Sequence, residues 1–235
     1  MKAVILAGGK GTRLAPYSTI LPKPLLPIDG VPILDVIIRQ LIRYGFKDVT
    51  LAVGHLAELV MAYCGDGTKY NIRLTYSREE RPLGTAGPLA TIPGLNEPFL
   101  VTNGDVLTTM DFADMWRFHK QQGAIATLAV TKRDVKIELG VVRSQDGVWV
   151  DEYIEKPTLN YSVSAGVYVF EPAVLTYIPR GLPLDLPDLI LKLGRDNQRV
   201  ACYLHDGYWL HISREDDYKT AIQEFVSHRD EFLNQ

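Results

Sequence analysis

Short apolar runs alternate with amphipathic segments through the first 131 residues of the chain. Runs of apolar and β-branched residues predict strands at 2–7, 49–53, 72–76, 99–102 and 125–131. The segments between them have helical periodicity, which predicts helices at 33–44, 55–63 and 112–122 and a short helix at 85–91. Strands that alternate with helices in this way favour an α/β fold, in which helices cover both faces of a mainly parallel sheet.

The pattern after residue 131 is less regular. Strands are predicted at 163–170 and 200–204, at 140–142 and 148–154 on either side of the Gln145-Asp146-Gly147 turn, and short helices at 171–177 and 186–193. Residues 213–232 are predicted to form one closing amphipathic helix, which Ser213 and Asp216 would start as a capping box. No repeat, low-complexity segment or linker divides the chain, so we expect residues 1–235 to form a single domain.

Composition narrows the class of protein. The 235 residues are enough for one large domain, and the hydrophobic share of 46% is ordinary for a globular protein. A formal net charge of −3 argues against nucleic acid as a partner. No apolar run approaches the ~20 residues of a membrane span, so we expect no membrane partner. The N-terminal apolar run ends in glycines, which indicates a core strand and not a signal peptide, and predicts a cytoplasmic protein.

The N-terminal segment carries the strongest chemical signal. The strand at 2–7 breaks into Gly8-Gly9-Lys10-Gly11, Arg13 follows, and Lys23 lies between two prolines. Successive free N–H groups on a glycine-rich turn can bind an anion, and Arg and Lys can add positive charge to it. These residues favour binding of a polyphosphate. The alternative is a tight turn with solvated basic residues, because no Gly-Lys-Ser/Thr completes a Walker P-loop.

Asp105 is a second candidate site residue. It follows the strand at 99–102 through Asn103-Gly104, just as Gly8 follows the first strand. In open parallel sheets ligands bind beyond the carboxyl ends of the strands, so Asp105 and the glycine-rich turn can share one crevice. A carboxylate there suits Mg²⁺, which takes one or two carboxylates besides substrate phosphate. The alternative is an Asp that bonds its own turn.

Seven motifs in order along the chain carry a resemblance to a known family. They are LAGGKGTRL at 6–14, PKPLLPI at 22–28, PLGTAGPL at 82–89, NGD at 103–105, EKP at 155–157, AGVYVF at 165–170 and GYW at 207–209. Together they resemble the sugar-nucleotide pyrophosphorylases (sugar-1-phosphate nucleotidyltransferases), and most closely their mannose-1-phosphate guanylyltransferases. The resemblance implies a Rossmann-like three-layer nucleotidyltransferase domain with a nucleotide-binding half at about 1–110 and a sugar-binding half at about 111–235. The left-handed β-helix that often follows in this family is not expected.

The resemblance also implies roles for individual residues. Arg13, Lys23 and Asp105 correspond to catalytic residues, and Asp105 also to a metal ligand. Residues at the nucleotide site would be Leu6, Ala7, Gly8, Gly9, Gly11, Thr12, Arg13, Glu79, Pro82 and Gly84. Residues at the sugar phosphate would be Asn103, Gly140, Glu155, Lys156 and Gly166. The alternatives are a surface ion pair for Glu155 and Lys156, and a bulge or packing role for the two glycines.

Glu79 bears on the choice of nucleobase. Thymidylyl- and uridylyl-transferring members commonly have Gln at the matching position, whose amide can both donate and accept hydrogen bonds. An ionised Glu only accepts, which suits the N1–H and N2–H₂ donors of guanine. We therefore expect GTP with mannose 1-phosphate as the substrate pair. The alternative is UTP or dTTP with glucose 1-phosphate or another hexose or heptose 1-phosphate, since some uridylyltransferases also have Glu here.

One motif departs from the family pattern. The Gly-Tyr/Phe-Trp-x-Asp-x-Gly motif ends here in His211 and Ser213, so His211 replaces the Asp that usually completes the metal site. Imidazole is a poorer ligand than carboxylate for Mg²⁺ and a better one for softer ions such as Mn²⁺. His211 can bind the metal, or Asp105 can suffice with substrate phosphates, or the chain can have lost catalysis and kept binding.

We thus expect an enzyme that joins a nucleoside triphosphate and a sugar 1-phosphate, with Mg²⁺ as cofactor and Mn²⁺ as its substitute. A non-catalytic nucleotide-sugar-binding subunit is a second class, motivated by His211. A metal-dependent glycosyltransferase is a third, although the LAGGKGTRL segment disfavours it. A homodimer is compatible with all three classes.

Overall fold

A seven-stranded sheet forms the centre of the computed structural model, which describes residues 1–233. The strand order is β12 (Val200–Leu204), β8 (Ala126–Lys136), β11 (Thr158–Phe170), β6 (Phe99–Asn103), β1 (Lys2–Ala7), β4 (Asp48–Val53) and β5 (Arg73–Arg78). β1 pairs in parallel with β4 and β6, β4 with β5, and β8 with β12, whereas β11 is antiparallel to both of its neighbours. The predicted mainly parallel α/β sheet is confirmed.

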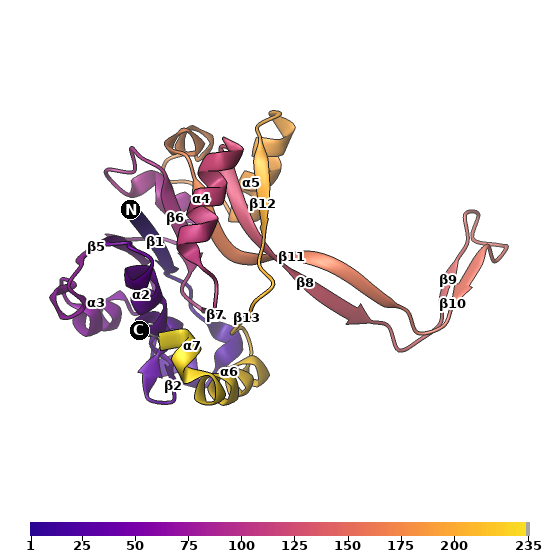
Figure 1. Cartoon of the computed structure of the whole chain (residues 1–235), viewed down its shortest axis with the longest axis horizontal. Helices are drawn as coiled ribbons and strands as arrows, with labels where there is room; N and C mark the ends of the chain where they lie inside the picture. Colours follow the sequence, from indigo (N-terminus) through magenta and orange to yellow (C-terminus); the bar gives the residue numbers. More distant parts are fainter. Residues whose placement is uncertain (234–235) are drawn as a thin grey trace.

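Helices cover both faces of the sheet, as predicted (Figure 1). One face packs against α2 (Ile33–Arg43), α3 (Ala57–Cys64), α4 (Phe112–Gln122), α6 (Glu215–Ser227) and α7 (Arg229–Leu233). The other face packs against α5 (Leu186–Arg195) and two 3₁₀ segments, Gly87–Thr91 and Pro172–Tyr177. A short helix, α1 (Tyr17–Ile20), lies in the loop after β1. The strands are apolar on both sides because both of their faces are buried.

The main differences from the predicted elements lie in the second half of the chain. The predicted C-terminal helix is interrupted at His228 between α6 and α7. The predicted capping pair is wrong, because Asp217, and not Asp216, accepts the backbone N–H groups of Ser213 and Arg214, at 2.9 and 2.7 Å. Helix α4 and strand β12 have the predicted bounds.

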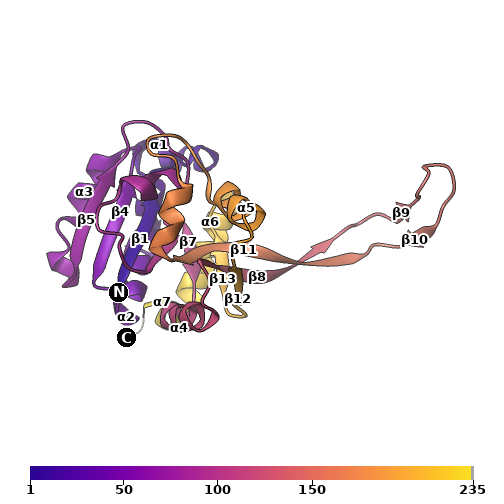
Figure 2. The same ribbon diagram turned by 90° about the horizontal axis from the view of Figure 1, so that it is seen from above.

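The largest difference is a two-stranded arm that projects from the body (Figures 1 and 2). The predicted strands at 125–131 and 163–170 are longer than expected, and their outer halves pair from Thr131↔Val163 to Lys136↔Thr158 without another strand beside them. Beyond them, β9 (Val141–Arg143) and β10 (Glu152–Ile154) form a hairpin. We call residues 131–163 the arm.

Two short antiparallel pairs complete the structure. β2 (Pro27–Ile28) pairs with β3 (Val31–Pro32), and β7 (Val106–Thr108) pairs with β13 (Trp209–His211). The second pair sets His211 opposite Val106, next to Asp105. It therefore joins the last strand of the chain to the loop that follows β6. Within residues 1–233, no helix has the length and apolar character needed to cross a membrane.

Candidate active site

A pocket of about 580 Å³ opens at the carboxyl ends of β1, β4 and β6. This is the edge at which ligands bind in open parallel sheets, and the volume is in the range of small-molecule sites. Predicted site residues that line it are Leu6, Ala7, Gly8, Gly9, Lys23, Glu79, Pro82, Gly84, Asn103, Asp105 and His211. The structure thus brings together residues from the glycine-rich turn, the Pro-Lys-Pro segment and strand β13.

Glycines bring the strand ends close together at the floor of the pocket. A Cβ on Gly54 would lie 2.9 Å from the carbonyl oxygen of Gly8, and one on Gly104 would lie 2.8 Å from the carbonyl oxygen of Leu6. The backbone N–H of Gly104 donates to that same Leu6 oxygen at 2.9 Å. Side chains here would push the strand ends apart, so these glycines serve close backbone packing.

Lys23, Asp105 and His211 form a connected cluster on one side of the pocket. Lys23 is 8% exposed in a 3₁₀ turn between its two prolines, and its Nζ lies 2.5 Å from Asp105 Oδ2. His211 Nε2 lies 3.3 Å from the same oxygen. The β7–β13 pairing holds this contact, because the backbone N–H of Ile212 donates to the Asp105 carbonyl at 3.0 Å.

The surroundings of Asp105 favour its charged form. Burial opposes ionisation, but the hydrogen bond to His211 and the charge of Lys23 outweigh it and hold the pKa of Asp105 below its ordinary value. Its other oxygen, Oδ1, is buried and has no hydrogen-bond partner among the described residues. A buried carboxylate oxygen without a partner fits a bound cation. No group of three or more His, Cys, Asp or Glu in residues 1–233 forms a site that could hold a metal by itself, so substrate oxygens would have to supply further ligands.

Glu79 lies on the opposite side of the pocket, against the glycine-rich turn. Its Oε2 accepts the backbone N–H of Leu83 at 2.8 Å, and a Cβ on Gly8 would meet its Oε1 at 2.7 Å. Burial raises the pKa of Glu79, and the bond from Leu83 partly offsets this. Oε1 is therefore the oxygen left for a ligand.

Gly84 lies near Glu79 in the chain, at a point where the backbone of Leu184 comes close to it. Its φ of +73° is in the region that favours glycine, and a Cβ there would lie 2.5 Å from the carbonyl oxygen of Leu184. Thr85 continues the loop and donates through its backbone N–H to Asp185 at 2.9 Å. The loop is thus fixed to the segment before α5.

Three residues of the predicted nucleotide site, Gly11, Thr12 and Arg13, do not line the pocket. Gly11 packs on Lys23, where an added Cβ would lie 3.1 Å from the lysine Cβ. Thr12 and Arg13 are exposed on a 3₁₀ turn, and Arg13 borders a neighbouring groove of about 950 Å³ that shares His211 with the pocket. Arg13 therefore lies outside the pocket itself, and its role at the phosphates stays a prediction.

Three residues of the predicted sugar-phosphate site lie on the arm or at its outer end, away from the pocket. Gly140 precedes β9, and Glu155 and Lys156 follow β10. The ring of Tyr153 covers Gly140, where a Cβ would clash with its hydroxyl, and that hydroxyl donates to Glu155 at 3.1 Å. Gly140 thus packs against a side chain, which was the alternative interpretation.

Gly166, by contrast, lies beside the pocket. It sits in the bulge between Ser164 and Tyr168 with a φ of +71°, and a Cβ there would meet Asn103 Nδ2 at 2.7 Å. Gly166 thus allows Asn103, which lines the pocket, to pack on the bulge.

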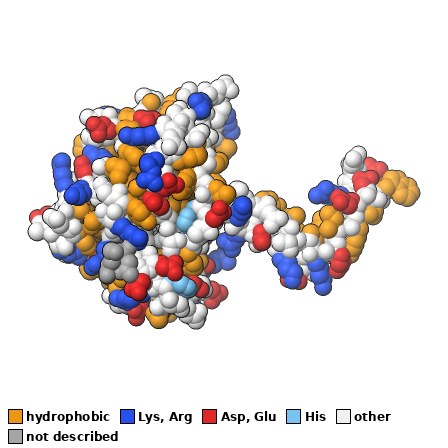
Figure 3. Space-filling model, in the orientation of Figure 1, with side chains coloured by type: hydrophobic (Ala, Val, Ile, Leu, Met, Phe, Trp, Pro, Cys, Tyr) orange, Lys and Arg blue, Asp and Glu red, His pale blue; other side chains and the backbone are white. Residues whose placement is uncertain are grey.

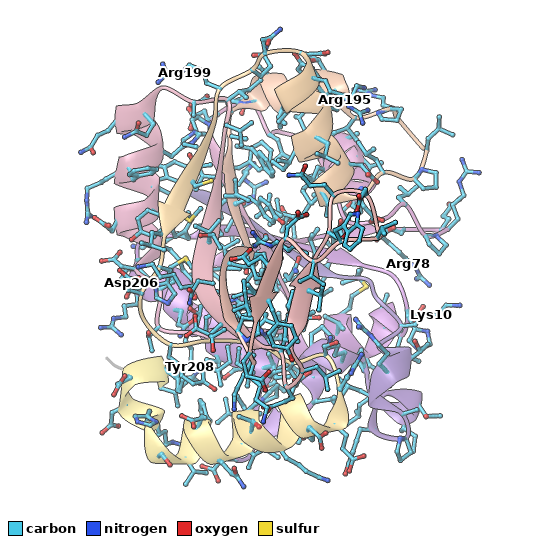
Figure 4. All side chains as sticks on the ribbon, turned by 90° about the vertical axis from the view of Figure 1, so that its right-hand side faces the viewer. Lys10, Arg78, Arg195, Arg199, Asp206 and Tyr208 are labelled. Carbon is cyan, nitrogen blue, oxygen red and sulfur yellow. The ribbon has the colours of Figure 1, made fainter. Side chains whose placement is uncertain are left out.

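The pocket residues that were not predicted from the sequence include Gly54, His55, Arg81 and Thr85. Gly54 and His55 directly follow β4. Ligands bind beyond the carboxyl ends of parallel strands, which is the rule that predicted Gly8 and Asp105. The same rule applies to β4, so the sequence could also have predicted Gly54 and His55. Lys10 also lines the pocket, and Figure 4 shows it at one side of the face from which the arm leaves, with Asp206 and Tyr208 at the other.

Comparisons with known proteins identify the family of the chain. The pattern that defines the nucleotidyl transferase family matches residues 2–228. The UTP–glucose-1-phosphate uridylyltransferase of Synechocystis sp. is 34% identical over 97% of this chain. The mannose-1-phosphate guanylyltransferase catalytic subunit beta of Danio rerio is 36% identical over 94% of it. The chain spans 64% of the length of each of these relatives.

Solved structures share the fold. The structure of HddC from Yersinia pseudotuberculosis complexed with GMP-PN superimposes with a TM-score of 0.74 at 22% identity, covering 95% of this chain and 99% of that one. At this identity the similarity concerns the arrangement of helices and strands. It agrees with the Rossmann-like three-layer fold.

Proposed function

The chain belongs to the nucleotidyl transferase family, and we propose that it condenses a nucleoside triphosphate with a sugar 1-phosphate to give an NDP-sugar and pyrophosphate. The observation that carries the proposal is the buried Lys23–Asp105 pair beside a glycine-rich turn at the carboxyl edge of the sheet. Positive charge and exposed backbone N–H groups at such an edge suit a triphosphate.

The proposed reaction is a displacement at the α-phosphorus. An oxygen of the sugar phosphate forms a bond to this phosphorus, and the bond to the bridging oxygen of the β-phosphate breaks. The electron pair of the broken bond leaves on pyrophosphate. Both substrates are anions, so the protein has to position them and neutralise their charge.

Each residue of the cluster has a distinct task in this scheme. Lys23 is pre-oriented by its prolines and by Asp105, so its ammonium group can stabilise charge on the α-phosphate without reorganising. Asp105 Oδ1 would hold a divalent cation together with substrate phosphate, and His211 would lie beside it. When bound, Mg²⁺ or Mn²⁺ would supply further charge neutralisation at the phosphates.

We propose GTP and mannose 1-phosphate as the preferred substrates. Glu79 Oε1 lies at the pocket wall and, when ionised, can only accept hydrogen bonds, which suits the donors of guanine. The alternative pair, UTP and glucose 1-phosphate, is supported by the similar identity to a uridylyltransferase. Release of pyrophosphate from a panel of triphosphates and sugar 1-phosphates, with Mg²⁺ or Mn²⁺, tests both. Binding without turnover for every pair would support a non-catalytic nucleotide-sugar-binding protein instead.

Glu79→Gln is expected to lower the preference for GTP over UTP, measured as the ratio of kcat/KM values, by about 10–100-fold. The amide would present both a donor and an acceptor where the carboxylate only accepts, while its oxygen can still hold the Leu83 N–H. Glu80→Gln is the matched control, since Glu80 also lines the pocket but is exposed. An unchanged ratio in Glu79→Gln would show that the base is read elsewhere.

His211→Asp is expected to lower the Mg²⁺ concentration needed for half-maximal turnover by about tenfold, because a second carboxylate would face the cation beside Asp105. The ratio of activity with Mn²⁺ to activity with Mg²⁺ should fall as well. Metal titrations of the variant and of His228→Asp, which changes an exposed histidine at the end of α6, provide the comparison. Identical titrations for His211→Asp and the unchanged protein would remove His211 from the metal site.

A further inference from the structure

Few cations line the pocket in the described part of the chain. Its described lining cations are Lys10, Lys23 and Arg81, and Lys23 is already paired with Asp105. The proposed substrates bring two phosphate-bearing groups into this space, and a phosphate monoester alone carries about −1.5 to −2 at pH 7. Even with Lys23 and a bound divalent cation, a further cation in the pocket would strengthen the binding of two such anions.

The outer end of the arm holds a polar cluster that one chain does not use. Tyr153 bonds Glu155, and Lys156 beside it has a φ of +44°, which is rare for a side-chain-bearing residue and rarer before proline. Backbone strain of this kind often marks functional positions. From Thr131, six residues of extended chain at ~3.3 Å each place this cluster about 20 Å beyond the sheet.

The arm does not fold back onto its own pocket. The ladder from Thr131↔Val163 to Lys136↔Thr158 is continuous, so the ribbon has no bend in its outer half. The bulge where it joins the body is fixed, because Ala165 and Val167 are fully buried and Trp209 Nε1 donates to the Ala165 carbonyl at 2.8 Å. Reversal of the arm would break these contacts.

The outer part of the arm has the surface of an interface. Leu139, Val148, Trp149, Val150 and Tyr153 are each more than 60% exposed, and Figure 3 shows hydrophobic side chains at the end of the arm. Hairpins of two short strands are only marginally stable alone in water. Exposed apolar residues gathered on such a hairpin indicate that another surface covers them.

A second copy of the chain offers a matching surface. The groove that shares His211 with the pocket starts at the base of the arm and is lined by Arg13, Lys132, Tyr208, Trp209, His211 and Arg214. Most of its lining is polar or charged, but Tyr208 and Trp209 give it an aromatic surface that apolar side chains of the arm can contact, and its His211 end leads to Asp105. Since β8 leaves the sheet at its carboxyl end, the arm starts from the same edge at which the pocket opens.

We propose that two copies exchange arms about a two-fold axis, so that Glu155 and Lys156 of one copy complete the sugar-phosphate side of the pocket of the other. Each arm lies in the groove of the partner, and its Lys156 supplies an additional positive charge. In a two-fold dimer, both arms make the same contact with the groove of the other copy, so both pockets are completed in the same way. The roles of Glu155 and Lys156 rest on the proposed function, whereas the arm exchange itself does not.

Mixed dimers test the assignment of Lys156. Lys23→Ala and Lys156→Ala are made with different affinity tags, co-expressed and purified through both tags. Each variant alone should be nearly inactive, and the mixed dimer should recover about half of the wild-type activity, because one of its two pockets combines an intact Lys23 with an intact partner arm. An active wild-type protein whose mixed dimer recovers nothing overturns the proposal.

Two measurements need no activity. In sedimentation, the wild-type protein should be a dimer, and Trp149→Asp should raise the dissociation constant at least about tenfold. Leu191→Asp, a similar change at an exposed leucine of α5, should not. In a Cys202→Ser background, a bifunctional maleimide should join Lys156→Cys in one chain to Arg13→Cys in another.

These measurements separate failure of the arm exchange from failure of the proposed function. A monomeric wild-type protein, or crosslinking only within one chain, overturns the exchange. A crosslinked dimer without turnover for any substrate pair supports the exchange and rejects the proposed enzyme.

Discussion

Lys23→Ala is expected to lower kcat by about 10²–10³-fold with the fold intact, because it removes a pre-oriented positive charge from the side of the pocket that holds Asp105. The alanine would leave Asp105 buried without its nearest cation. The affinity of this carboxylate for a metal ion would therefore change as well. Turnover of the substrate panel, with pyrophosphate release as the signal, measures the loss. Circular dichroism of the variant verifies that its helices and sheet remain.

A matched control shows whether the loss of activity comes from the position of Lys23 or from the removal of any lysine. Lys120→Ala removes an exposed lysine from the last turn of α4, remote from the pocket lining, and should leave kcat unchanged. Lys23→Arg keeps the charge but changes its shape and reach, so partial activity is expected. Full activity in Lys23→Ala would exclude this lysine from the mechanism.

Asp105→Asn is expected to reduce turnover by about 10³-fold and to lower the free energy of unfolding by up to about 3 kcal/mol. The amide keeps the shape but cannot neutralise Lys23, which is 8% exposed and would become a buried cation without a carboxylate. Removal of one partner from a buried ion pair typically costs about 3–5 kcal/mol. We expect the lower end of this range, because the side chains of Lys23 and Asp105 are still 10% and 19% exposed.

The pH dependence of stability gives a second test of Asp105. The folded state lowers its pKa, so its contribution to stability is fully present above the unfolded pKa of about 3.9 and is lost as pH falls through the folded pKa. Urea unfolding gives the free energy of unfolding at pH 7 and near pH 3. The difference between these two values should be smaller for Asp105→Asn than for the wild type. Equal differences in the two proteins would mean that the Lys23–Asp105 pair does not stabilise the fold. Glu97→Gln, at an exposed carboxylate in the loop before β6, is the control for the general effect of removing one charge.

The sequence predicts the body of this protein well because burial leaves a strong pattern. Strands such as β1 and β6 are covered on both faces, so they read as continuous apolar runs bounded by glycine or asparagine. The carboxyl ends of these parallel strands meet at one edge of the sheet, which is why the sequence could place Gly8 and Asp105 in the same crevice.

The arm could not be predicted in the same way. Its outer strands carry Lys132, Arg133, Asp134 and Lys136, and no core faces them, so hydrophobic periodicity carries no signal there. The EKP motif likewise indicates a chemical role without a position, because a short motif contains no information about its distance from the pocket in space. The shift from Asp216 to Asp217 at the start of α6 is a local matter of one residue, which is the usual uncertainty at a helix end.

The pairing of β7 with β13 has a consequence for the synthesis of this protein. The two strands are about a hundred residues apart in the chain, and the partner of Asp105 at position 211 is translated long after the glycine-rich turn. On a ribosome, which adds residues from the N-terminus, the parallel strands can assemble early, whereas the contact between Asp105 and His211 forms only after residue 211 has emerged from the exit tunnel. Termination between β6 and residue 211 would therefore release a chain that has its glycine-rich turn but lacks the histidine beside Asp105.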